Sequence, residues 1–178
     1  MLVRRAAPCA WAATRGITRR SLSTAPFSIQ GALTTLPHGE IPAIGVDAHV
    51  IHTFRLEDTK RFAELNGDSN PIHTDADFAQ REGGFAAPIV QGMLSASLFA
   101  TIFGRTIPGA VYISQALRWR IPLLVDEQVR ASIRVVRVRK RFVDCETLCE
   151  RTRDGAVIVE GQATVLLPPK PSNTGTAA

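Results

Sequence analysis

The first half of the chain carries short periodic stretches separated by irregular ones. Residues 28–46 are rich in Gly, Pro and Thr and predict an irregular lead-in. Apolar and polar positions then alternate over Val50–Leu56, which predicts a β-strand. The segment that follows places Phe62 and Leu65 on one face of a helix, and Gly67 is expected to end that helix.

The most apolar stretch spans Pro88–Phe103, where nearly every position is apolar or small. Pro88 suits the first turn of a helix, and Gly104 suits a C-cap. A helix without a polar face is expected to be buried on all sides. At about 1.5 Å per residue it would be roughly 24 Å long, which fits the core of a small domain and is too short for a bilayer.

Strand patterns dominate the second half, with a strong hairpin signal at Asp154-Gly155. The strand-like stretches cover residues 110–119, 128–142, 144–152 and 156–167. In the second of them the apolar alternation slips by one position at Val135-Val136, as a β-bulge would produce. Because a bulge bends and twists its strand, the pattern predicts an α+β fold in which a long, curved antiparallel sheet is wrapped around one central helix.

The positive charge of the chain is concentrated at its N-terminus. The 178 residues contain 21 Lys+Arg and 16 Asp+Glu, a net charge of +5. Five arginines and no acid precede residue 27, so the remainder has 21 − 5 = 16 basic against 16 acidic residues. Residues 1–26, rich in Arg, Ala, Ser and Thr, have the composition of a mitochondrial transit peptide. The alternative is a retained basic arm that binds nucleic acid, but the neutral remainder favours no nucleic-acid partner.

The rest of the chain is expected to form one domain of ordinary size. Residues 27–46 would be the lead-in, 47–168 the folded domain and 169–178 a flexible tail. Three cysteines are too few for a disulfide scaffold. No stretch approaches the roughly 20 apolar residues of a membrane span, so none is expected.

Candidate chemistry lies between the two predicted helices, in a loop that contains Asp68, Asn70, Pro71 and His73. Taken singly, these residues fit a polar turn in which Asp68 is an N-cap. Taken together, a carboxylate and an imidazole on either side of a stiff proline can converge as an acid/base pair. A calcium loop starting at Asp68 is excluded, because Ile72 and His73 occupy the positions of a ligand and a glycine.

A longer motif includes this loop and carries a resemblance. The sequence FAELNGDSNPIH begins at Phe62, and IVQGML begins at Ile89. Further matching pieces are Pro108-Gly109, Tyr112-Ile113-Ser114-Gln115 and Pro122-Leu123. Over about residues 54–168 the chain resembles the MaoC-like (R)-specific enoyl-CoA hydratase family. The resemblance implies a hotdog fold and a homodimer.

The same resemblance implies roles for individual residues. Asp68 and His73 would be the catalytic pair, and the backbone N–H of Gly92 would donate to the thioester oxygen. Asn70 would orient Asp68 or the water. Gln91 stands where many relatives have His, and either supports the helix start or is a surface amide. The chemistry implied needs no metal and no redox cofactor.

Further residues bear on the substrate. Ala96, Ala100 and Phe103 are candidates for the lining of an acyl tunnel, and Gln115 is either a supporting residue or a plain polar residue of its strand. A cluster of basic residues could meet an acidic carrier protein or the phosphates of CoA, or could be a solvated strand face. It consists of Arg130, Arg134, Arg137, Arg139, Lys140 and Arg141.

The resemblance and the N-terminal segment together indicate an enzyme of mitochondrial fatty-acid synthesis, similar to the mitochondrial 3-hydroxyacyl-thioester dehydratases of type 2. It would reversibly dehydrate (R)-3-hydroxyacyl thioesters, carried by acyl carrier protein or CoA, to trans-2-enoyl thioesters in the matrix. Alternatives are an (R)-specific enoyl-CoA hydratase of acyl-CoA metabolism, a hotdog acyl thioesterase, for which an acid at the buried helix would be expected, and a non-catalytic acyl-binding module. The presence of both Asp68 and His73 favours a hydratase or dehydratase.

Overall fold

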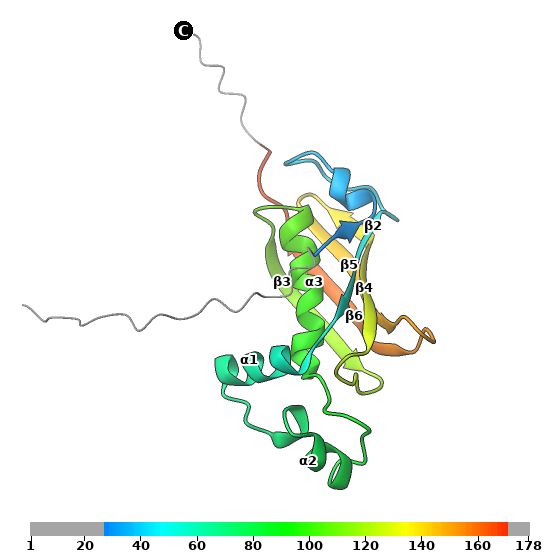
Figure 1. The fold of residues 1–178 in the computed structure, drawn as a ribbon. Coiled ribbons are helices and arrows are strands. Elements are labelled where there is room, and N and C mark those ends of the chain that lie inside the picture. Colours follow the sequence, from blue (N-terminus) through cyan, green and yellow to red (C-terminus); the bar gives the residue numbers. More distant parts are fainter. Residues whose placement is uncertain (1–26, 171–178) are drawn as a thin grey trace, which may run out of the picture.

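The computed structural model describes residues 27–170, and one antiparallel sheet with a helix packed along it dominates them (Figure 1). The strands follow the order β1-β2-β4-β5-β6-β3 across the sheet. Their bounds are β1 Ile29–Gln30, β2 Asp47–Thr53, β3 Val111–Trp119, β4 Gln128–Arg139, β5 Phe142–Arg151 and β6 Val157–Leu166. The helices are η1 Ala32–Thr35, α1 Leu56–Asn66, η2 Pro71–His73, α2 Ala76–Arg81 and α3 Gly92–Thr106. The predicted transit peptide and most of the predicted tail lie outside the described residues.

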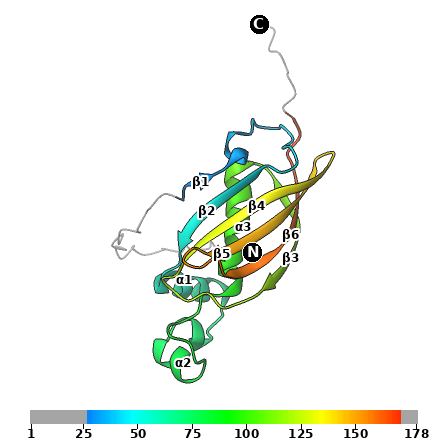
Figure 2. The same cartoon turned by 90° about the vertical axis from the view of Figure 1, so that its right-hand side faces the viewer.

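The core forms between the inner face of the curved sheet and α3, as the sequence pattern predicts (Figure 2). In β4, Val129, Ala131, Ile133 and Val135 are all fully buried against the helix. The register between β4 and β5 then shifts between Val135 and Arg137, which confirms the predicted bulge. The predicted turn at Gly155 is also confirmed, because this glycine adopts a left-handed conformation with φ of 69° at the end of the hairpin.

The start of α3 differs from the prediction. Residues 88–90 are extended, because the Val125 N–H donates to the Pro88 carbonyl at 2.9 Å and the Val90 N–H donates to the Leu123 carbonyl at 2.8 Å. The helix therefore begins at Gly92 instead of Pro88. At its other end it continues through Gly104, predicted as the C-cap, to Thr106.

Burial of α3 on all sides was also expected, and within a single chain this is wrong. One stripe of the helix is exposed and includes Met93, Ser97, Ala100 and Gly104. The opposite face, with Leu98, Phe99 and Ile102, is fully buried. The helix is thus covered by the sheet along one side only.

The region before α3 contains three further corrections. The strand predicted over Val50–Leu56 is β2 and ends at Thr53, because the Arg55 N–H donates to the Asp58 carboxylate at 2.8 Å and α1 begins at Leu56. Leu65, predicted on the apolar face of this helix, is 83% exposed. The predicted irregular lead-in contains β1, whose Ile29 pairs with Val50.

The predicted basic cluster lies on β4 and the β4–β5 hairpin, and its strand residues are compensated by acids of β5. Arg130 stands opposite Glu150, and Arg134 stands opposite Glu146. Arg137 and Arg139 both form ion pairs with Asp144, with Arg137 Nε at 2.6 Å and Arg139 Nη2 at 3.3 Å from Asp144 Oδ2. The cluster is therefore largely a strand face of mixed charge. This agrees with the alternative interpretation of these residues as a solvated strand face.

The two cysteines of β5 lie in the core. Cys145 and Cys149 are both free thiols buried on the inner face of the sheet. Burial raises the pKa of each thiol to about 12. Both side chains therefore act as small apolar core residues and not as nucleophiles.

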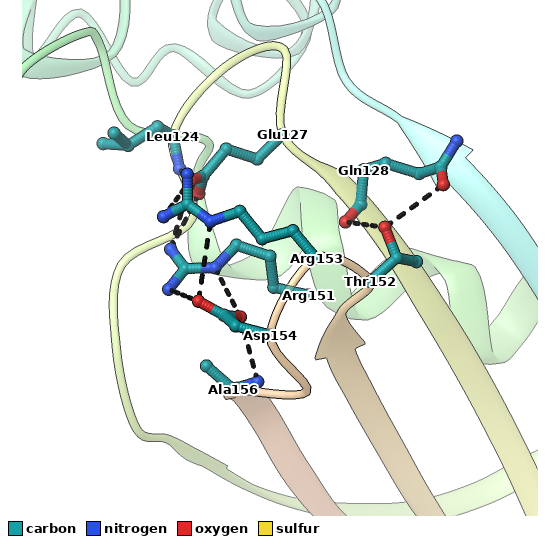
Figure 3. Close-up of polar contacts among 8 residues, drawn as sticks. All are labelled: Leu124, Glu127, Gln128, Arg151, Thr152, Arg153, Asp154 and Ala156. Atoms are coloured by element: carbon teal, nitrogen blue, oxygen red, sulfur yellow. Dashed lines mark hydrogen bonds and ion pairs between the residues drawn. The ribbon is translucent and has the colours of Figure 1, made fainter.

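A polar cluster ties the β5–β6 hairpin to the loop before β4 (Figure 3). Arg151 reaches Glu127 at 3.1 Å and Asp154 at 2.7 Å, and its hydrogen bonds hold the pKa of Asp154 below the usual range. Glu127 in turn accepts the backbone N–H of Leu124 at 3.1 Å. Because the Arg151 and Glu127 side chains are only 14% and 11% exposed, this cluster fixes the loop that leads from Leu123 into β4.

Replacement of Arg151 tests this assignment. We expect Arg151→Met to lower the free energy of unfolding by about 2 kcal/mol, since hydrogen bonds to charged partners are lost. The Arg153→Met control removes a guanidinium that is 65% exposed and should cost less than about 1 kcal/mol. Urea unfolding measures both.

The effect should also depend on pH. The lowered pKa of Asp154 stabilises the fold above the range where a free aspartate titrates, and this stabilisation is lost as the pH falls through the lowered pKa. The difference between Arg151→Met and the unchanged chain should therefore shrink below about pH 4. Equal losses for the Arg151 and Arg153 variants would contradict the assignment.

Candidate active site

The loop after α1 is shaped by three consecutive side-chain turns. α1 ends at Gly67, whose φ of 79° is the left-handed conformation that glycine adopts without strain. The Asp68 N–H donates to the Asn66 side chain at 2.9 Å, and the Asn70 N–H donates to Asp68 Oδ1 at 3.2 Å. Asn70 Oδ1 then caps η2 by accepting the Ile72 N–H at 3.3 Å. These turns occupy Oδ1 of Asp68 and leave Oδ2 for another partner.

That partner is His73, at the end of η2. Its Nε2 lies 3.7 Å from Asp68 Oδ2, while its Nδ1 lies 2.7 Å from the Ile89 carbonyl oxygen. A carbonyl only accepts hydrogen bonds, so Nδ1 carries the proton and Nε2 of the neutral ring is free to accept one. The His73 side chain is 12% exposed and that of Asp68 is 39% exposed, which leaves the pair open to solvent on the aspartate side.

His73 and Gly92 line the same cavity, which has a volume of about 320 Å³. Gly92 is the first residue of α3, and no acidic residue stands in the first turn of that helix. Ser95 and Trp119 contribute to the wall. The remaining lining residues are largely apolar: Ile89, Val90, Arg120, Ile121, Pro122, Leu123 and Ile158. An apolar cavity beside a helix N-terminus favours an uncharged ligand that develops negative charge at that end.

Glycine is required at position 92 for a steric reason. A Cβ atom there would lie 2.7 Å from Nε1 and 2.9 Å from Cε2 of Trp119. The indole ring therefore packs directly on the first residue of α3. No larger residue fits without displacement of Trp119.

Gln91 is not a helix-surface amide, one of the two interpretations of its sequence position. It is the N-cap of α3 and is 3% exposed, and its Nε2 donates to the Thr59 carbonyl of α1 at 3.0 Å. Its Oε1 is buried without a hydrogen-bond partner among the described residues. Gln91 thus joins the start of α3 to α1.

The other residues predicted for the site do not line this cavity. Ala96 is buried in α3, Ala100 is exposed on it, and Phe103 packs edge-on against Tyr112 with ring centroids 5.4 Å apart. Gln115 accepts a hydrogen bond from the Tyr112 hydroxyl at 2.5 Å and donates to Thr147 at 3.1 Å. Burial raises the pKa of Tyr112 to about 12, so its hydroxyl stays a hydrogen-bond donor.

A second, larger hollow of about 820 Å³ lies between α1, β2 and α3. Phe62 and Leu65 of α1 contribute to its lining, which gives the exposed Leu65 a place on an apolar wall. Phe27 closes part of it and stacks on His52 with ring centroids 4.6 Å apart. Burial lowers the pKa of His52. This hollow does not include Asp68, His73 or Gly92.

Trp119, Ser95 and Arg120 are cavity residues that the sequence analysis missed. Ser95 lies one turn beyond Gly92, and in the sequence it is only one of several small residues of this helix. Trp119 stands at the end of a predicted strand. Its role depends on Gly92, its neighbour in space, and the sequence does not reveal that contact.

Among the described residues no group of three His, Cys, Asp or Glu side chains could hold a metal ion. Within the same part of the chain, no helix has the length and apolarity to cross a membrane.

Comparisons of the sequence identify relatives. The family model described as "MaoC like domain" matches residues 40–157. A mitochondrial 3-hydroxyacyl-[acyl-carrier-protein] dehydratase of Solanum lycopersicum is 37% identical over 120 residues, 65% of this chain and 72% of the relative. An (R)-specific enoyl-CoA hydratase of Aeromonas caviae is 37% identical over 129 residues, 70% of this chain and 95% of the relative.

Comparison with solved structures gives the same result for the fold. The (R)-hydratase of Aeromonas caviae superposes with a TM-score of 0.69 at 34% identity, and the match covers 72% of this chain and 99% of that one. The R-hydratase PhaJ1 of Pseudomonas aeruginosa gives 0.68 at 27% identity and covers 72% of this chain and 84% of that one. These neighbours confirm the predicted hotdog fold, and the relatives are named as hydratases or dehydratases, which are hydro-lyases. The chain belongs to the MaoC-like dehydratase family.

Proposed function

We propose that this enzyme reversibly dehydrates (R)-3-hydroxyacyl thioesters to trans-2-enoyl thioesters with Asp68 and His73 as its acid/base pair. The observation that carries the proposal is the 3.7 Å approach of His73 Nε2 to Asp68 Oδ2. His73 lines a cavity that also includes the first residue of α3, and Asp68 lies beside His73, outside the lining itself. Hydration and dehydration need a pair that moves two protons and a donor to the thioester oxygen, and all three groups are present.

The hydrogen bonds of the pair prepare it for proton transfer. The Ile89 carbonyl fixes the His73 ring with Nε2 unprotonated, and the Asn70 N–H fixes the Asp68 carboxyl through Oδ1. Nε2 and Oδ2 thus face one another with space for a water or a substrate hydroxyl. In dehydration the pair removes the Cα proton and delivers a proton to the departing hydroxyl. In hydration the same steps run in reverse.

Gly92 supplies stabilisation of the charge that develops. As the Cα–H bond breaks, negative charge moves onto the thioester oxygen. The first backbone N–H groups of α3 have no partner within the helix and lie at the positive end of its dipole. The Gly92 N–H, next to the cavity, would therefore donate more strongly to the enolate than to the substrate.

The thioesterase alternative lacks support in this geometry. It was expected to carry an acid at the buried helix, and the first turn of α3 has none. A non-catalytic acyl-binding module would not need the hydrogen bonds that hold Asp68 and His73 in place. The names of the relatives include both carrier-protein dehydratases and CoA hydratases, which run the same chemistry in opposite directions.

The proposed location is the mitochondrial matrix, and the proposed carrier is an acyl carrier protein. Both rest on relatives in Solanum lycopersicum and Arabidopsis thaliana that are named as mitochondrial acyl-carrier-protein dehydratases. The basic composition of residues 1–26 agrees with this location. No metal or redox cofactor enters the proposed steps.

Substitution of the pair tests the proposed function. With trans-2-enoyl-CoA as substrate, loss of the conjugated thioester absorbance should report formation of the (R)-3-hydroxy product. Asp68→Asn and His73→Gln should each lower kcat by at least about 100-fold, the scale of a positioned acid/base group. Asp77→Asn and His49→Gln remove the same chemical groups elsewhere and should leave kcat unchanged.

Two results would overturn the proposal. Full activity in either the Asp68 or the His73 variant would exclude the pair as the acid and base. Release of free thiol without loss of the double bond would identify a thioesterase.

The carrier should approach at the end of the molecule where α3 begins. Arg118 is exposed on β3 and stands opposite Glu160 of β6, but it forms no ion pair among the described residues, and its neighbours Trp119 and Arg120 line this cavity. The β4–β5 hairpin with Lys140 lies at the opposite end of the sheet from α1 and α2 (Figures 1 and 2). The uncompensated tip of the predicted basic cluster is therefore far from the proposed chemistry.

Charge-reversal variants test which end of the molecule the carrier approaches. With an acyl-carrier-protein substrate, Arg118→Glu should raise KM about 3- to 10-fold at low salt, because a rim charge steers association. The effect should fade as salt is added, and a CoA substrate should be less sensitive. Lys140→Glu makes the same change of charge at the far end and should leave KM unaltered. A larger effect of the Lys140 variant would place the carrier at the hairpin.

We also propose that two copies of the chain associate through β3. In the described part of the chain this strand pairs with β6 only and is an edge of the sheet, and it exposes Val111 by 55% and Ile113 by 50%. The exposed stripe of α3 provides further surface without charge, with Met93 60% exposed. An edge strand with apolar side chains is a template for pairing with another chain.

Lysines on this edge test the association. The unchanged chain should have twice the mass of one chain by light scattering, and Val111→Lys/Ile113→Lys should have the mass of a single chain. Ile51→Lys/Val136→Lys places the same charges on exposed apolar positions of β2 and β4 and should remain dimeric. The β3 edge would be excluded as the interface if the unchanged chain were monomeric, or if the control variant alone dissociated.

A further inference from the structure

Trp119 is the cavity residue to which no role has been assigned. It is the last residue of β3, and its indole packs on Gly92 with Nε1 2.7 Å from the position that a Cβ would take. That position is two covalent bonds from the Gly92 nitrogen. The indole nitrogen and the amide nitrogen are therefore neighbours at the start of α3, and both residues line the cavity that contains His73.

The indole N–H has no acceptor within the described chain. Trp119 takes part in none of the side-chain hydrogen bonds of residues 27–170, and its side chain remains 44% exposed. An indole nitrogen is a donor only, and a packed tryptophan usually satisfies it. Here the donor stands at the edge of an apolar cavity, next to an amide that has no partner within its helix.

Backbone pairing with β6 holds the chain at Trp119. Trp119 pairs with Val159 across the sheet, and the next N–H along the chain, that of Arg120, donates to the Ile158 carbonyl at 2.8 Å. The Arg120 side chain forms an ion pair with Glu160. Backbone pairing with β6 and packing of the ring on Gly92 thus place the indole beside the amide before substrate arrives, as a donor must be if it is to stabilise a developing charge without large reorganisation.

We propose that the Nε1–H of Trp119 is a second hydrogen-bond donor to the thioester oxygen, beside the N–H of Gly92. This inference rests on the proposed function and adds a catalytic residue to it. Two adjacent donors can share one oxygen, since a carbonyl or enolate oxygen accepts more than one hydrogen bond. The proposal also accounts for glycine at position 92, because only glycine lets the indole come close enough to the amide for both to reach the same atom.

An isosteric replacement of the indole separates donation from packing. The sequence has two tryptophans, so in a full-length Trp11→Phe chain Trp119 is the only one. Biosynthetic incorporation of β-(benzothiophen-3-yl)alanine then replaces its N–H by sulfur and retains the bicyclic ring. We expect kcat for trans-2-enoyl-CoA to fall about 10- to 100-fold relative to Trp11→Phe, near the lower range for loss of one donor to an oxyanion. KM should change by less than about 3-fold, because the lost interaction strengthens in the transition state.

A spectroscopic measurement reports directly whether the indole N–H donates to the carbonyl of a bound thioester. In a Trp11→Phe/Asp68→Asn chain, trans-2,4-hexadienoyl-CoA would bind without rapid hydration. Polarisation of its carbonyl shifts the absorbance of the conjugated system to longer wavelength. The shift should be reduced when the benzothiophene analogue replaces the indole, and a residue that only packs would not change it.

The possible outcomes distinguish a failure of this inference from a failure of the proposed function. An inactive Trp11→Phe chain that fails to hydrate or dehydrate any thioester would remove the function and the donor together. An active chain whose kcat and absorbance shift are both unaffected by the analogue would overturn the donor alone. A rise in KM with unchanged kcat would assign Trp119 to substrate packing and would likewise overturn it.

Discussion

The extended segment Pro88–Gln91 is the constraint on which the site depends. Its hydrogen bonds to Leu123 and Val125 fix it against the loop before β4, and this prevents the helix from beginning at Pro88. The Ile89 carbonyl of the same segment orients His73, and Gln91 ties the segment to α1. Four residues thus determine both the tautomer of the imidazole and the point at which free helical amides appear.

This arrangement explains how an otherwise exposed loop can hold reactive groups. The turns at Asn66, Asp68 and Asn70 shape the loop locally, but none of them reaches the core. Two hydrogen bonds connect the loop to the extended segment: His73 Nδ1 donates to the Ile89 carbonyl, and the Ile89 N–H donates to the Ile72 carbonyl. Loss of the extended segment would therefore separate His73 from Gly92 even if the loop and α3 each kept their own structure.

The sequence predicted features that depend on local pattern and missed those that depend on distant partners. The strand pattern located β3 within one residue. The alternation in β4 located the bulge at Val135, because burial of β4 against α3 imposes a period of two. It misplaced the start of α3, since Pro88 suits a first turn and the bonds that keep it extended come from Leu123 and Val125. The basic cluster looked uncompensated for the same reason, because its acids lie on the neighbouring strand. The packing of Trp119 on Gly92 joins a strand end to a helix start and leaves no local signal in either.

β3 links the proposed chemistry to the proposed assembly. Its first half presents Val111 and Ile113 at an open edge, and its last residue carries the indole beside Gly92. Within residues 27–170, β6 is the only strand that pairs with β3. A second strand paired along the open edge would restrict the motion of β3 and hence the position of Trp119 relative to α3. Association would then contribute to catalysis through the rigidity of one donor, without any residue of the second chain having to touch the substrate.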